Sequence, residues 1–166
     1  FTGVLVSEDA VLTNGTDSLS DIRLIGALLV AAEATGCAAA ALDTIVDYLT
    51  TRKQFGRLIG SYQALKHPTV DVLMQMDSAR TLIYHAATLI GDGALDHDTQ
   101  IACRMSKAQA SEALSFAGDR AVQFHGGMGF TYECDAMLYI RRAQWTQHQY
   151  GDAQHHRKML ASLLLD

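Results

Sequence analysis

The sequence contains little proline, little cysteine and no run of basic residues. Pro68 is its single proline, so long segments carry no helix breaker, which favours helices. The three cysteines, Cys37, Cys103 and Cys134, are odd in number and far apart. Their spacing excludes a disulfide framework or a cysteine metal site and favours a reducing compartment, so we predict a cytoplasmic protein. With no Lys/Arg cluster and a formal net charge of −5, no nucleic-acid binding is expected.

Long apolar runs and an initiator methionine are also absent. The most apolar stretch, Leu24 to Leu42, is interrupted by Glu33 and Thr35, so we expect a buried helix and no membrane span. The chain begins at Phe1 without a signal-peptide pattern, and we expect it to be a piece of a longer protein. Hydrophobic residues make up 49% and charged residues 19%, as in a globular chain.

Apolar residues recur at helical spacing along most of the chain. Ser18 or Ser20 is expected to cap the first helix, and Asp98 the third. Segments rich in glycine or polar residues separate the helices, at 52–60, 91–98 and 125–130. The predicted helices are about 18–51, 62–91 with Pro68 in its first turn, 99–124, 134–147 and 153–165.

The first residues have a different pattern, with short apolar alternation from Phe1 to Leu12. This alternation predicts a strand that ends a preceding β domain, with residues 1–14 forming its end and a linker. Residues 15–166 are predicted to form the second domain. The predicted fold is therefore all-α, an antiparallel bundle of four to five helices with a short N-terminal strand remnant.

Two motifs stand at predicted helix ends. Arg52-Lys53-Gln54-Phe55-Gly56 combines a planar cation suited to phosphate with an aromatic face and a flexible turn. The stretch 123–130 (QFHGGMGF) offers a directional amide, and three glycines that expose backbone N–H groups to a ligand. Taken singly, each motif is also explained as an ordinary helix terminus. Three histidines near the C-terminus (148, 155 and 156) lack partners at metal-ligand spacing, so no metal is expected.

Taken together, the two motifs resemble the C-terminal helical domain of the acyl-CoA dehydrogenases. RKQFG followed by QFHGGMGF is specific to that pattern, and Ser106-Lys107-Ala108, Arg141-Arg142-Ala143 and Tyr150-Gly151 also match it. The resemblance covers essentially the whole chain. It implies an oligomer, a dimer or a dimer of dimers, that binds FAD between subunits. It further implies α,β-dehydrogenation of an acyl-CoA thioester, with electron-transferring flavoprotein as the acceptor.

The resemblance also implies which residues contact the FAD. The motif positions of the family correspond here to Arg52, Gln54, Phe55, Gln123, Gly126, Gly127, Asp152 and Gln154. Asp152 stands where the family usually has threonine.

The usual catalytic base of the family is absent. Most members carry a glutamate at the position of Tyr150, and others carry it at that of Gly26. A phenol is a poor base at neutral pH. Three explanations stay open: a partner subunit carries the glutamate, another carboxylate such as Asp152 serves, or the base or chemistry comes from elsewhere in a longer chain. Bacterial two-gene dehydrogenases for steroid side chains and other bulky CoA esters are of the first kind, and the Gly-Asp-x-x-His-His-Arg ending at 151–157 resembles that branch. Alternative functions are a non-catalytic subunit completing a partner's flavin site and a flavin oxidase relative.

Overall fold

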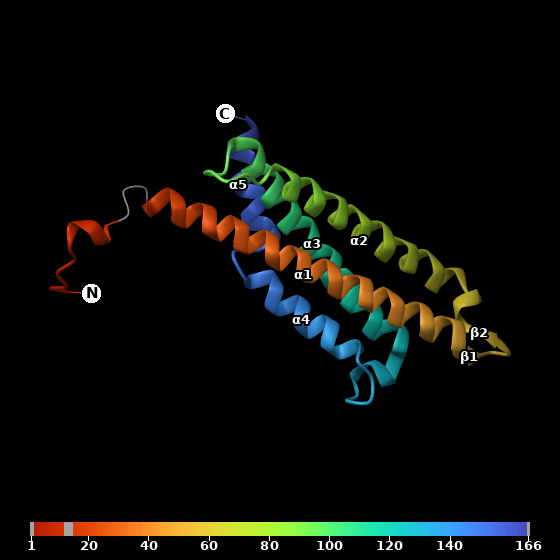
Figure 1. Cartoon of the computed structure of the whole chain (residues 1–166). Coiled ribbons are helices and arrows are strands. Elements are labelled where there is room, and N and C mark those ends of the chain that lie inside the picture. The colour runs from red at the N-terminus through yellow and green to blue at the C-terminus, as the bar shows by residue number, and fades with distance from the viewer. Residues whose placement is uncertain (1, 12–14, 166) are drawn as a thin grey trace.

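The computed structural model describes residues 2–11 and 15–165, and most of them lie in five α-helices. Successive helices from α1 to α4 run in opposite directions, with α4 beside α1, and α5 packs on α3 (Figure 1). The predicted all-α bundle is therefore confirmed. The helices are α1 (Gly15–Thr51), α2 (Gln63–Leu89), α3 (His97–His125), α4 (Ala136–His148) and α5 (Ala153–Leu165).

Helix α3 is the centre of the bundle and packs against each of the other four helices. The core around it is built largely from alanines of α1 and α3, such as Ala38 and Ala117, so the helix backbones approach closely. Gly118 shows how closely, because a Cβ there would lie 2.9 Å from the Cα of Ile140 on α4. A core of small residues fixes the helix spacing and, with it, the relative positions of the loops between helices.

The predicted N-caps of two helices are wrong. Helix α1 already begins at Gly15, so Ser18 and Ser20 lie inside it and do not cap it. The cap of α3 is Asp96, whose carboxylate accepts the N–H of Thr99 at 2.9 Å, while Asp98 sits in the first turn. The preceding loop is tied to α1, because Asp21 accepts the N–H of Leu95 at 3.1 Å. This hydrogen bond between helices holds the residue that precedes the cap of α3.

The other helix bounds agree to within a few residues. Helix α2 starts at Gln63, one residue after the predicted start, and Pro68 lies in its second turn and not in its first. Two short 3-10 helices flank the bundle loops, Ile59–Ser61 before α2 and Gly126–Phe130 after α3. Neither interrupts a helix of the core.

The N-terminal segment differs from the prediction. Residues 2–11 contain no strand and are exposed, and Glu8–Ala10 form one 3-10 turn. The predicted strand's first and last residues, 1 and 12, and part of the linker lie outside the described residues. A strand is stabilised by pairing with another strand, and no described segment pairs with this one. In the part of the chain that the structure describes, the only sheet is a short hairpin between α1 and α2.

Helix α1 is the element in which a membrane span has to be considered. Within it, Asp17–Thr51 is long and apolar enough, by length and composition, to cross a membrane, although no long uninterrupted apolar run occurs. Half of the most apolar 18-residue stretch of this helix is buried inside the bundle, and the core helices of soluble proteins can have the same length and composition. We therefore describe α1 as a helix of the bundle core.

Candidate functional site

The two sequence motifs meet at one end of the bundle. β1 (Lys53–Gln54) and β2 (Arg57–Leu58) form a hairpin directly after α1, near the C-terminal end of α3 (Figure 1). The hairpin and the glycine loop line one cavity of about 620 Å³, here called the hairpin cavity. Among the predicted FAD contacts, this brings together Arg52, Gln54, Phe55, Gly126 and Gly127.

The hairpin turn exposes the side chain of Phe55 to solvent. Gln54 pairs with Arg57, which leaves Phe55 and Gly56 as a two-residue turn with φ of 51° and 79°. Positive φ at both positions is the requirement of a type I′ turn, and it is uncommon for a residue with a side chain. The Phe55 ring is 89% exposed and has an edge contact with Tyr62 at 6.5 Å between centroids. A strained residue that exposes an aromatic ring indicates a contact surface.

The glycines of the other motif have two different roles. Gly126 ends α3 with φ of 59°, and a Cβ at Gly126 or Gly127 would have no heavy atom within 4 Å. Their backbone therefore lies open at the cavity, which suits a bulky ligand approaching the N–H groups. Gly129 is required for packing, because a Cβ there would lie 2.4 Å from the carbonyl oxygen of Val122. Gln123 is exposed on α3 but does not line the cavity.

The two usual base positions of the resemblance lie against each other. A Cβ on Gly26 would be 2.7 Å from Cζ of Tyr150, so the tyrosine ring covers this glycine of α1. Tyr150 and Gly151 form the turn between α4 and α5, with φ of 58° and 100°. Any side chain at position 26 would meet this ring, so a glutamate there is incompatible with Tyr150 as it is placed.

Two buried side chains hold this turn. Lys107 of α3 is fully buried, and its Nζ donates to the carbonyl oxygen of Gly151 at 2.9 Å and to Ser111 Oγ at 2.9 Å. His156 of α5 is 1% exposed, and its Nε2 lies 3.1 Å from the carbonyl oxygen of Tyr150. Burial lowers the pKa of Lys107 to about 8, with Asp152 acting in the opposite direction. Neither role was predicted from the sequence. The lysine among the alanines and serines of α3 was the one feature that could have indicated a buried, hydrogen-bonded side chain.

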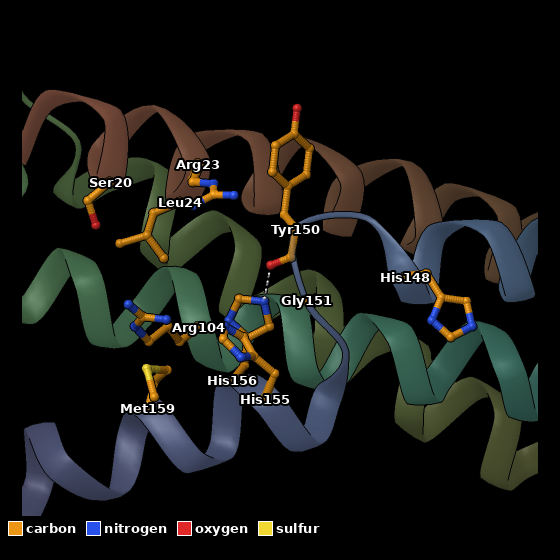
Figure 2. A pocket seen from close by; sticks show the side chains of 10 residues that line it. All are labelled: Ser20, Arg23, Leu24, Arg104, His148, Tyr150, Gly151, His155, His156 and Met159. Carbon is orange, nitrogen blue, oxygen red and sulfur yellow. Dashed lines mark hydrogen bonds between the residues drawn. The ribbon is translucent and has the colours of Figure 1, made fainter. Parts of the chain in front are cut away.

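A second cavity of about 440 Å³ lies beside this turn, and we call it the Tyr150 cavity. Half of its lining residues are arginine or histidine and none is acidic. Figure 2 shows them coming from α1, α3, the end of α4, α5 and the turn between α4 and α5. The lining residues are Ser20, Arg23, Leu24, Arg104, His148, Tyr150, Gly151, His155, His156 and Met159.

Asp152 and Gln154 face elsewhere. Both line a third cavity of about 400 Å³ between α3, α4 and α5, together with polar residues such as Glu112 and Arg157. Asp152 Oδ1 accepts the N–H of His155 at 2.7 Å and so caps α5. This hydrogen bond keeps the pKa of Asp152 below its usual value. Of the predicted FAD contacts, five thus line the hairpin cavity, Asp152 and Gln154 line this separate one, and Gln123 lines neither.

Comparison with known proteins identifies the family. Residues 15–165 match the family described as acyl-CoA dehydrogenase, C-terminal domain. The chain belongs to this family, as the motifs and the bundle indicate.

Several relatives share the domain. Acyl-CoA dehydrogenase IpdE2 of Mycolicibacterium smegmatis is 37% identical over 145 residues, which cover 86% of this chain and 44% of the relative. Butyryl-CoA dehydrogenase from Megasphaera elsdenii superposes with a TM-score of 0.80 at 30% identity, covering 87% of this chain and 38% of the other. The steroid ACAD Tcur3481-Tcur3483 superposes with a TM-score of 0.82 at 25% identity, covering 92% and 41%. The chain therefore spans less than half the length of each of these relatives.

Proposed function

We propose that this chain is the C-terminal part of an FAD-dependent acyl-CoA dehydrogenase and contributes FAD contacts and subunit contacts to an oligomer. The observation that carries the proposal is the hairpin cavity. It joins two motifs that are distant in the sequence, and family membership explains why both are present. The substrate is an acyl-CoA thioester, and the expected acceptor is electron-transferring flavoprotein in the cytoplasm.

The hairpin cavity has the chemistry that a nucleotide cofactor requires. Arg52 makes no ion pair within residues 2–11 and 15–165, so its guanidinium is available to a pyrophosphate. Phe55 offers an aromatic face, and Gly126 and Gly127 offer open backbone. When bound, FAD supplies the acceptor for the hydride that leaves the β carbon of the acyl group. The residues of this chain bind and orient that cofactor.

The separation of the predicted contacts supports an oligomer. The hairpin cavity shares no lining residue with the cavity of Asp152 and Gln154. We infer that the two regions serve different FAD molecules, so that one chain completes the site of a neighbour while contributing to its own. The same arrangement fits a homo-oligomer and a mixed oligomer.

For the catalytic base, we favour a partner subunit that carries the glutamate. The Tyr150 ring lies on Gly26, and no carboxylate lines the Tyr150 cavity. Asp152 is a weaker candidate, because it caps α5 and lines another cavity. The relative Tcur3481-Tcur3483 is named as a pair of proteins and as a steroid enzyme, which supports a mixed oligomer and a bulky CoA ester. A non-catalytic subunit that completes a partner's flavin site is the second candidate function, supported by the same tyrosine–glycine contact.

Arg52→Ala tests the cofactor assignment. Loss of a charged hydrogen-bonding group is expected to weaken FAD binding about tenfold or more, measured as the ratio of flavin to protein absorbance after dialysis of the assembled protein. Arg80→Ala on α2, whose guanidinium pairs with Asp77 away from the cavity, is the matched control and should retain FAD. Equal FAD retention in both variants would refute the assignment of RKQFG.

Anaerobic titration with acyl-CoA esters, including a steroid-type ester, tests the origin of the base. The full-length chain is purified alone and with any co-encoded homologue, and flavin absorbance is followed. Bleaching only in the complex supports partner dependence. Bleaching of the chain alone would contradict it and would make Asp152→Asn the next variant.

A further inference from the structure

The Tyr150 cavity carries positive charge that the described residues do not neutralise. Its lining contains Arg23 from α1, Arg104 from α3 and three histidines, and no acidic residue (Figure 2). Neither arginine makes an ion pair within residues 2–11 and 15–165, whereas four other arginines of the chain pair with a carboxylate. Asp152, which lines another cavity, interacts electrostatically with two of the histidines. The charge left without a counterion is therefore that of the two arginines.

Arg104 holds the less hydrated of these two charges. It is half-buried, while Arg23 is exposed, and burial lowers the pKa of Arg104. Only Nε of its guanidinium is enclosed without a partner, and no described residue hydrogen-bonds the two terminal nitrogens, which therefore keep accessible surface. A guanidinium that is partly removed from water and has no carboxylate is unfavourable. An anion that enters the cavity and meets the terminal nitrogens would supply the missing interaction.

The cavity lies next to the place where the reaction of the family is expected. Arg23 precedes Gly26 by three residues on α1, so the two lie about one turn apart on one face of the helix. Tyr150 lies against Gly26 and itself lines the cavity. The reacting carbons of an acyl-CoA are expected beside these two positions, so the cavity can take the part of the acyl group beyond them. The phosphates of CoA lie at the other end of the long pantetheine arm.

We propose that the Tyr150 cavity binds a carboxylate at the far end of the acyl group, with Arg104 as its direct partner and Arg23 adding positive potential. A guanidinium pairs with a carboxylate through two parallel hydrogen bonds, a geometry that no other side chain offers. Leu24 and Met159 in the same lining provide apolar contacts for the carbon chain. The substrate class is thus the CoA monoesters of dicarboxylic acids. This inference rests on the proposed function, because it takes the acyl group to lie beside Tyr150.

Isothermal titration calorimetry of the assembled full-length protein tests the inference. The probes are trans-2-enoyl-CoA esters with a terminal carboxylate, in a series of chain lengths, each compared with the ester of the same length that ends in a methyl. Enoyl esters have already lost the two hydrogens, so they do not reduce the flavin during the titration. At one chain length or more, the carboxylate ester should bind about ten- to a hundredfold tighter, the range expected for hydrogen bonds to a charged group.

Arg104→Gln assigns that preference to the cavity. The variant keeps a polar side chain but loses the charge and the paired donors, so the preference should fall to about threefold or less. Arg23→Gln, at an exposed position, should reduce the preference by a smaller factor of about two to five, and it does not depend on a half-buried site. Arg120→Gln is the control on the same helix as Arg104. Its guanidinium pairs with Asp119 outside the cavity, so the preference should stay unchanged.

Three results would overturn the inference. The first is equal binding of carboxylate and methyl esters at every length, and the second is a full preference in both Arg104→Gln and Arg23→Gln. The third is an equal weakening of both kinds of ester by Arg104→Gln, which would mean that the cavity holds a phosphate of CoA. If no ester of either kind binds, the proposed acyl-CoA function itself fails.

Discussion

Replacing His156 by glutamine should flatten the dependence of folding stability on pH between about 4 and 6.5. In the folded protein the pKa of His156 is lowered from 6.5 to about 4, chiefly by burial. Between these two values the unfolded chain binds a proton that the folded chain excludes. Stability therefore falls as the pH decreases through this window, and the loss is complete below the folded pKa.

The structure sets the size of this effect. A lowering of the pKa from 6.5 to about 4 corresponds to a loss of about 3 kcal/mol in the free energy of unfolding once both states are fully titrated. Between pH 6.5 and pH 4 the difference is smaller, because each titration is only half complete at its own pKa, so we expect at least about 2 kcal/mol. The cationic groups near the ring, Arg104 and Lys107 from α3 and His155 from α5, all keep the proton off His156.

Urea unfolding of the full chain at a series of pH values measures the effect. The wild type should lose about 2 kcal/mol more than His156→Gln between pH 6.5 and pH 4. His85→Gln, which replaces an exposed histidine, should follow the wild type. Parallel profiles for the wild type and His156→Gln would refute the assignment of His156 as a neutral buried side chain, even if the variant is less stable at every pH.

Two further predictions concern the helix contact and the base position. Gly118→Ala should destabilise the bundle by about 1–3 kcal/mol, because a Cβ would meet the Ile140 backbone at 2.9 Å. Gly36→Ala, which has open space around it, should instead stabilise α1 by about 0.5–1 kcal/mol. Equal urea unfolding midpoints for the two variants would contradict the close packing at Gly118. Tyr150→Glu should let acyl-CoA bleach the flavin of the chain purified alone, while Tyr150→Gln should not; no bleaching by either would show that this position does not face the substrate.

Much of the fold could be predicted because its signals are local. Apolar spacing and the near absence of proline define five helices, and both motifs lie at helix ends, as expected. Helix starts were less predictable. The cap of α3 is Asp96, and the residue before it is hydrogen-bonded to Asp21 of α1, a contact that no local pattern indicates. The predicted strand at residues 1–12 was not seen in residues 2–11, because alternation alone does not provide a pairing partner.

The same distinction between local patterns and contacts between helices applies to the candidate site. The sequence by itself determined the helical class, the family and the absence of glutamate at positions 26 and 150, since these depend on residue type and spacing. Only the tertiary structure decided that Tyr150 covers Gly26, that Asp152 faces a separate cavity, and that Lys107 and His156 hold the turn. These are contacts between helices far apart along the chain. Their geometry depends on how closely the alanine-rich helices pack, which no local pattern encodes.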